Sequence, residues 1–432
     1  MAHKRILLLA LPMILSNITT PLIGMVDTAV LGHMSGSHYL AGSAIAGLII
    51  TQLYWLCGFI RMSSTGLSAQ AKGQNSPHNA SKALYQSLVI ALVIAALILM
   101  IQRPLLNLGL YFAESSAEVV KVIQDYFYIR ILGAPAALAN LALIGWLIGQ
   151  QQTKQVLLVQ VIANLLNAGL SMTLVFVLGM GVSGVAAASV VAEYFIFASS
   201  LYFALQMHIP KIPQPAWLKF KALKALLALN SHTFVRNLAL QLCIAFLVLQ
   251  GAKLGPMTAA TNAILMQFFT LIALGLDGIA YAVEALVGEA KGKSSQLQIT
   301  LVTLGGLFYS GVVALLYSLL FVLTGSGIIA LLSDQAPLQT MAAEYLPIIW
   351  LLPLLAHWCF LLDGVFVGLT RAKAMQNSML LSCLVFYISS WYLLPEYGNW
   401  GLWFAMLIFM LARGLILGLY FFYLHRKGLL LA

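Results

Sequence analysis

Twelve long apolar runs constrain the fold of this chain more than any other feature. Each approaches the length of about 20 residues that an α-helix needs to cross a bilayer. Continuous runs of this kind exclude the alternating pattern of a membrane β-barrel. The runs lie at about 6–31, 40–62, 83–102, 120–147, 156–178, 183–207, 222–250, 258–287, 297–324, 341–367, 376–394 and 400–425. The sequence therefore predicts an all-α polytopic membrane protein with twelve transmembrane helices.

The scarcity of charge leads to the same conclusion. Only 8% of the 432 residues are charged and 62% are hydrophobic, whereas a soluble domain has about 25% charged residues. The first run is too long for a cleavable signal peptide and has no small-residue cleavage site, so we expect it to remain as the first helix. The four cysteines fall in apolar segments without a Cys-x-x-Cys pair, which is typical of buried thiols.

The basic residues predict how the chain is oriented. With the N-terminus inside, fifteen of the 22 lysines and arginines fall in inner loops and termini, three in outer loops and four within the runs. Basic residues accumulate in cytoplasmic loops of membrane proteins. We therefore expect both termini in the cytoplasm of a cell with a bacterial-type inner membrane. The net charge of +10 reflects these loops, and no nucleic-acid partner is expected.

The two halves of the sequence match at a constant offset of 219 residues. The tripeptide at 71–73, Ala-Lys-Gly, recurs at 290–292, and Gly149 and Lys154 recur as Gly368 and Lys373. Each half has six helices and enters the membrane from the same side, so the repeat is parallel, with a pseudo-two-fold axis along the membrane normal. The predicted domains are an N-lobe (1–207), a proline-containing cytoplasmic linker (208–221) and a C-lobe (222–432). Transporters built this way bind substrate near the midplane between the lobes.

Asp27 is the only ionisable residue between Ile6 and Leu31. A charged side chain at the centre of a bilayer costs about 2.5–3.5 kcal/mol on insertion scales, so such residues usually belong to an ion or proton pathway. Burial disfavours the charged form of a carboxyl group, which suits a group that exchanges protons. Pro21 removes one backbone hydrogen bond below Asp27 and predicts either a moving hinge or a static bend.

Polar residues of the fifth and sixth helices form a second candidate group. Asn167 and Ser171 share one helix face because they are four residues apart. Ser189 lies one turn before Glu193 on the next helix. Together these side chains could hydrogen-bond Asp27 and hold or relay a proton or Na⁺. The alternative is that they join neighbouring helices, as polar residues often do in membrane bundles.

Substrate contacts are predicted at two further places. Aromatic residues crowd the second helix and suit a plastic cavity for bulky amphipathic ligands, although packing or a lipid-facing surface is the alternative. Arg236 of the seventh helix and Asp277 of the eighth could form an ion pair with each other or contact the substrate. Asp363 lies near an inner helix end and is expected to be solvated. The predicted substrate residues are Gln52, Tyr54, Trp55, Phe59, Arg236 and Asp277.

Several function classes are excluded by missing motifs. The sequence has no Gly-Lys-Ser/Thr phosphate loop, so the chain is not expected to hydrolyse ATP. It has neither His-Glu-x-x-His nor Gly-x-Ser-x-Gly, so no enzyme activity is expected. No metal site and no cofactor are predicted beyond a coupling ion, H⁺ or possibly Na⁺.

Three segments resemble the multidrug and toxic compound extrusion (MATE) family, in particular its DinF-like branch. They are LALPMILSNITTPLIGMVDTAVLGHM (9–34), GFIRMSSTGLSAQAKG (58–73) and NLLNAGLS with GVSGVAAASVVAEY (164–171 and 181–194). The resemblance implies cation-coupled export of organic, often cationic and amphipathic compounds. It implies that Asp27 is the coupling aspartate of the first helix and that Asn167 and Ser189 are the accompanying amide and hydroxyl. The adjacent residues Glu193 and Tyr194 resemble a pair typical of the DinF-like branch.

One position departs from the family pattern. The acid that follows the fifth-helix asparagine in other branches is Ser171 here. Because a metal ion needs several oxygen ligands and a proton needs one base, this departure favours H⁺ over Na⁺. The expected function is thus a monomeric H⁺-coupled multidrug antiporter with alternating access. A flippase for lipid-linked precursors and a non-transporting receptor or scaffold are the alternatives.

Overall fold

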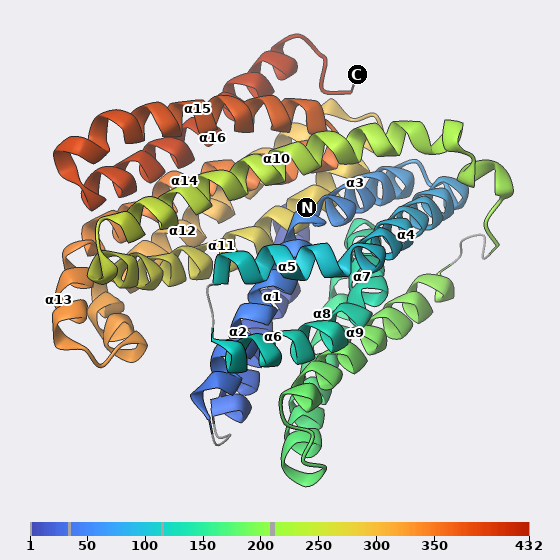
Figure 1. Ribbon diagram of the computed structural model, residues 1–432. Helices are drawn as coiled ribbons and strands as arrows, with labels where there is room; N and C mark the ends of the chain where they lie inside the picture. Colours follow the sequence, from blue (N-terminus) through green and yellow to red (C-terminus); the bar gives the residue numbers. More distant parts are fainter. Residues whose placement is uncertain (1, 33–35, 114–115, 208–211, 432) are drawn as a thin grey trace. The chain divides into compact units, whose positions relative to one another are not determined.

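The structure is a computed structural model that describes residues 2–32, 36–113, 116–207 and 212–431, without the side chains of residues 2, 20–25, 37, 112 and 113. The described residues form α-helices with a few short helical turns and no strand, which confirms the predicted all-α class. Figure 1 shows the helices along the chain. In the first half they are α1 (Ala2–Gly32), α2 (Ser37–Leu56), α3 (Phe59–Gly73), α4 (Pro77–Met100), α5 (Gln102–Ala113), α6 (Ala117–Arg130), η1 (Ile131–Gly133), α7 (Ala134–Gly149), α8 (Thr153–Met172), η2 (Thr173–Val177) and α9 (Gly181–Gln206).

The second half has fewer and longer helices. They are η3 (Pro215–Leu218), α10 (Phe220–Lys253), α11 (Pro256–Gly292), α12 (Gln296–Leu332), α13 (Ala336–Glu344), α14 (Leu346–Gly368), α15 (Ala372–Tyr397) and α16 (Asn399–Arg426). Among the described residues, eleven helical stretches are long and apolar enough to cross a membrane. The 31-residue helix α1 makes the twelfth, so the arrangement agrees with the twelve predicted spans.

The chain divides into two compact units. The N-terminal unit comprises 15–227, and the C-terminal unit comprises 228–432 together with 1–14. The first turns of α1 belong to the C-terminal unit, where Arg5 forms an ion pair with Glu289 of α11. The predicted domain boundaries at 207 and 222 stay a prediction. In the described part of the linker, Trp217 is buried and its carbonyl accepts a hydrogen bond from Gln86 of α4 at 2.8 Å.

The internal repeat extends to single hydrogen bonds. Lys72 donates to the carbonyl of Gln150 at 2.7 Å, and Lys291, 219 residues later, donates to the carbonyl of Leu369 at 2.9 Å. Each bond ties the end of one helix to the end of another within its own unit. The duplicated lysines of the sequence therefore have the same structural role in both halves.

The helices that follow these lysines begin in the same way. The hydroxyl of Ser76 accepts from the backbone N–H of Asn79, and that of Ser295 accepts from Gln298. Serine at this position satisfies one of the free N–H groups at a helix start. The preceding residue has a positive φ in both copies, 51° at Asn75 and 55° at Ser294.

Close helix contacts also recur in both units. A Cβ added at Gly149 would lie 2.5 Å from the carbonyl oxygen of Thr65, and one at Gly368 would lie 2.6 Å from that of Glu284. Only glycine allows α7 to approach α3, and α14 to approach α11, this closely. In the N-terminal unit the contact is reinforced by Ser68, whose hydroxyl donates to the carbonyl of Trp146 at 2.8 Å.

Candidate functional site

The N-terminal unit contains a polar cavity of about 400 Å³. Five helices, α1, α2, α6, α8 and α9, contribute its walls. It is the place in this unit where the ionisable residues of three spans meet. The lining consists of Asp27, Thr28, Leu31, Leu40, Ser43, Ala44, Gly47, Ile50, Thr51, Tyr126, Arg130, Asn164, Asn167, Ser189, Ala192, Glu193 and Ile196.

Asp27 is half-buried in this cavity and accepts hydrogen bonds from α8. The hydroxyl of Ser171 donates to Asp27 Oδ1 at 2.9 Å. The bond joins two helices through residues 144 positions apart in the chain. A carboxylate that accepts neutral hydrogen bonds is stabilised in its ionised form without being neutralised.

Asn167 links Asp27 to α9. With its amide oxygen toward Ser189, Asn167 accepts from the Ser189 hydroxyl at 3.1 Å and from its backbone N–H at 3.2 Å. The amide nitrogen then donates to Asp27 Oδ1 at 3.3 Å. This orientation satisfies both neighbours, which is the criterion for choosing between the two orientations of an amide. The hydrogen-bonded row therefore runs from Asp27 through Asn167 to Ser189.

A buried ion pair lines the same cavity. Arg130 Nη1 of α6 lies 2.6 Å from Glu193 Oε1 of α9, and the two side chains are 17% and 14% exposed. The guanidinium of Arg130 also lies 5.9 Å from the ring centre of Tyr54. Opposite charges in a low-dielectric setting pair strongly, because each would otherwise be desolvated without compensation.

The local backbone explains why Glu193 is held here. Between α6 and α7 the chain tightens into the short turn η1, which ends at Gly133. A Cβ added at Gly133 would collide with Glu193 Oε2, so glycine makes the space for the carboxylate. Asn140 of α7 donates to the backbone carbonyl of Glu193 at 2.9 Å, and Tyr194 donates to the carbonyl of Leu132 at 3.1 Å. Three contacts thus fix this turn of α9 against η1 and α7.

The structure brings together the predicted polar group, with one difference. Asp27, Asn167, Ser171 and Ser189 form one hydrogen-bonded cluster, as expected from their helix faces. Glu193 lines the cavity but pairs with Arg130 rather than with Asp27. The reason is that a permanently charged guanidinium attracts a carboxylate, whereas a second carboxylate repels it and a neutral amide binds it more weakly.

The predicted aromatic group of the second helix does not line this cavity. The cavity instead meets the preceding turns of α2, through Ser43, Gly47, Ile50 and Thr51. Trp55 is 41% exposed and Phe59 is buried in packing. Tyr54 does not line the cavity, but its ring lies against the guanidinium of Arg130. Gln52 is half-buried. A substrate role for Gln52, Tyr54, Trp55 and Phe59 stays a prediction.

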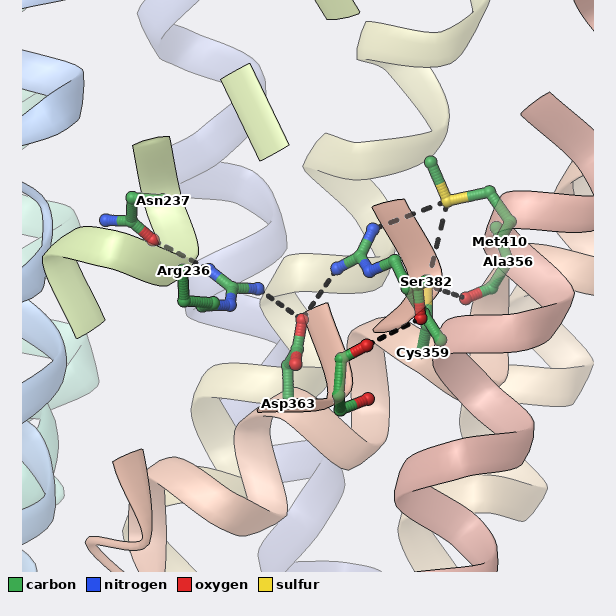
Figure 2. A network of polar contacts seen from close by, with 9 residues as sticks. Arg236, Asn237, Ala356, Cys359, Asp363, Ser382 and Met410 are labelled. Carbon is green, nitrogen blue, oxygen red and sulfur yellow. Dashed lines mark hydrogen bonds and ion pairs between the residues drawn. The ribbon is translucent and has the colours of Figure 1, made fainter. Parts of the chain in front are cut away.

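Arg236 belongs to a separate network in the C-terminal unit, shown in Figure 2. Its guanidinium forms an ion pair with Asp363 of α14 and donates to Asn237 at 2.8 Å. Arg413 of α16 donates to the same oxygen, Asp363 Oδ2, at 2.7 Å. Asp363 is thus an acid that Arg236 contacts, and the pairing of Arg236 with Asp277 stays a prediction.

The prediction that Asp363 is solvated was wrong. Its side chain is 12% exposed, although it lies only five residues before the end of α14. The helix end itself is packed against α11, so nearness to the end does not bring exposure. Two arginines compensate the charge there, which makes the network a structural element of the C-terminal unit.

Pro21 lies within α1, which is helical from Ala2 to Gly32. Its side chain lies outside the described residues, so the hinge stays a prediction. Two ionisable residues of the cavity lining, Tyr126 and Arg130, were not singled out from the sequence as site residues. One signal could have identified Arg130: it is an intramembrane arginine, and Glu193 is an intramembrane acid of a span in the same half. Charged residues inside a membrane span usually have a partner of opposite charge.

Comparison with known proteins agrees with this arrangement. The model of the MatE family matches residues 12–173 and again 233–393. The chain is 42% identical over 419 residues to DNA damage-inducible protein F of Escherichia coli K12, covering 95% of this chain and 90% of that protein. It is 24% identical to a probable multidrug resistance protein NorM of Chromobacterium violaceum, covering 98% and 94%.

Solved structures show the same fold. A multidrug resistance MATE family transporter in an outward-facing conformation superposes with a TM-score of 0.88 at 16% identity, covering 99% of this chain and 96% of that chain. A transporter of the MOP superfamily from Pyrococcus furiosus gives a TM-score of 0.87 at 17% identity, with the same coverage.

This chain belongs to the MatE family of membrane transporters. The resemblance found in the sequence is therefore confirmed. The two successive matches of one family model also support the predicted duplication. The protein is a multi-pass membrane protein of the multidrug efflux class, whose relatives are transporters rather than enzymes.

Proposed function

We propose that this transporter is an H⁺-coupled antiporter that exports amphipathic, cationic organic compounds and that Asp27 is its coupling group. The observation that supports this most is the cavity of the N-terminal unit, where the donors to Asp27 among the described residues, Ser171 and Asn167, are neutral. A carboxylate in that setting keeps its charge available for a proton or for a cationic ligand. The relatives named for multidrug resistance support the substrate class.

The coupling would work by competition for one negative charge. When Asp27 is ionised, the cavity attracts the cationic part of a substrate. When a proton enters from outside, Asp27 becomes neutral and the substrate loses its counter-charge and leaves. One proton then enters for each monovalent cation that leaves, so no net charge crosses the membrane and the pH gradient drives the exchange, with about tenfold accumulation per pH unit.

The neighbours of Asp27 favour a proton over Na⁺ as the coupling ion. Ser171 and Asn167 both direct N–H or O–H groups at Asp27. A bound Na⁺ needs oxygen lone pairs directed at it, so both groups would have to turn away. A proton needs only the carboxylate itself.

A lipid flippase is less well supported by this site. A cavity that accepts phosphate groups is expected to present basic side chains. The one arginine of the described lining, Arg130, is already paired with Glu193. We therefore retain efflux of organic cations as the proposed function. The transporter would lie in the inner membrane with both termini on the cytoplasmic side.

Purified protein in proteoliposomes tests the proposal. Uptake of a lipophilic cationic dye such as ethidium would be followed under an imposed pH gradient and, separately, under an imposed Na⁺ gradient. We expect transport with the pH gradient only, and its loss in Asp27→Asn. Transport driven by Na⁺ alone would overturn the choice of ion, and proton-driven transport by Asp27→Asn would overturn the role of Asp27.

A further inference from the structure

We propose that Glu193 is a positioning residue that holds Arg130 away from Asp27 and so keeps the coupling carboxylate free. The inference rests on the proposed function of Asp27 and adds a reason for the second acid of the cavity. In this inference Glu193 does not bind or release the coupling proton. The role of Glu193 is to be the preferred partner of the one guanidinium that could otherwise neutralise the site.

The first argument is the charge inventory of the cavity. Three ionisable side chains with charge at neutral pH line it among the described residues: Asp27, Glu193 and Arg130. The tyrosines that face them are Tyr126, which also lines the cavity, and Tyr54, whose ring lies against Arg130. Arg130 is therefore the only cation among the described lining residues, and either Asp27 or Glu193 could be its ion-pair partner.

The second argument is proximity. Arg130 and Asp27 line one cavity of about 400 Å³. The guanidinium of arginine stays charged at all physiological pH values. A carboxylate that is paired with such a group binds protons and cations poorly, because its charge is already compensated. Direct contact between Arg130 and Asp27 would thus disable the coupling step.

The third argument is that the fold is built to prefer the pair with Glu193. The turn at η1 places Gly133 where its missing side chain leaves room for Glu193 Oε2. Asn140 and Tyr194 fix the backbone of the same turn against α7 and η1. Oε2 has no hydrogen-bond partner among the described residues. The carboxylate is therefore oriented by Arg130 through Oε1 and by the shape of the Gly133 turn.

The test is an epistasis experiment with the full-length protein. Ethidium binding in detergent and ethidium transport under a pH gradient would be measured for Glu193→Gln, Arg130→Gln and the double variant. In Glu193→Gln, the unpaired Arg130 is expected to turn to Asp27. Binding should weaken by about ten- to hundredfold, the range that one hydrogen bond between charged groups provides.

Adding Arg130→Gln to this variant should restore most of the loss, because the competing cation is gone. Arg130→Gln alone should weaken binding less than Glu193→Gln does. A pair that serves only to join α6 and α9 would make the two single variants equally defective. Equal defects would overturn the inference, as would a double variant as weak as Glu193→Gln, which would indicate that Glu193 itself exchanges the proton.

Two further measurements keep the outcome decisive. If Glu193→Gln does not fold, Arg130→Gln alone must still bind ethidium within tenfold of the unmodified protein, and a larger loss overturns the inference. Asp27→Asn is measured in parallel. Failure of that variant to lose transport would overturn the proposed function, whereas equal defects at Glu193 and Arg130 with an inactive Asp27→Asn would overturn only the role of Glu193.

Discussion

Ser171 donates its hydroxyl to Asp27 across 2.9 Å, from α8 to α1. This bond connects the only ionisable residue of a long apolar run to a position where the resemblance to the family predicts an acid. A neutral donor at that position leaves one negative charge in the cluster instead of two. The relation between these residues determines how readily Asp27 takes up a proton.

Removal of that donor should shift the pH dependence of transport. The hydroxyl stabilises ionised Asp27, so Ser171→Ala makes the protonated form relatively more stable. The pH at which transport is half-maximal should therefore rise, by about one to two units if the bond contributes about 1.5–3 kcal/mol. Dye transport by proteoliposomes between pH 5.5 and 9 measures the shift. An unchanged profile would show that the bond does not control proton uptake.

Gly133 offers a steric test of the Glu193 site. Gly133→Ala has an allowed backbone, with φ of −73°, but its Cβ would collide with Glu193 Oε2. We expect it to displace the carboxylate from Arg130 and to reproduce the binding loss of Glu193→Gln.

Gly169→Ala is the matched control for that substitution. Gly169 lies in α8 of the same unit, and nothing lies within 4 Å of its added Cβ. Ethidium binding by the two variants should differ by at least about tenfold. Similar affinities would show that the space at Gly133 is not what positions Glu193.

Asp363 should affect stability rather than coupling. Asp363→Asn leaves two buried arginines without the acid that joins them, and removal of one member of a buried ionic network is expected to destabilise by about 3–5 kcal/mol. Thermal unfolding in detergent should show a clearly lower midpoint, while the pH profile of residual dye transport stays in place. Asp334→Asn, at an exposed position, is the control. A shifted pH profile in Asp363→Asn would indicate a coupling role in the C-terminal unit.

Much of the fold could be predicted because each half encodes the same contacts. The two lysines of the Ala-Lys-Gly tripeptides are scarce charges in apolar sequence, and both donate to the carbonyl at the end of a neighbouring helix. The helix faces of Asn167 and Ser171 likewise follow from their spacing of four residues. The internal repeat and the helical spacing of polar residues could therefore be predicted from the sequence.

Ion-pair partners could not be predicted in the same way. Asp277 was the acid expected to pair with Arg236, whereas the buried Asp363 of α14 lies against Arg236 and Arg413. The pairing of Arg130 with Glu193 depends on a short turn at Ile131–Gly133, where the helix changes its winding.

The most direct test of the central claim is proton-driven ethidium transport by Asp27→Asn in proteoliposomes, at matched protein content and with thermal unfolding measured in parallel. An asparagine keeps the shape of the side chain but binds no proton and has no charge. We predict a folded protein whose transport falls to the level of protein-free vesicles at every pH. Transport at the level of the unmodified protein, driven by the same pH gradient, would contradict the account.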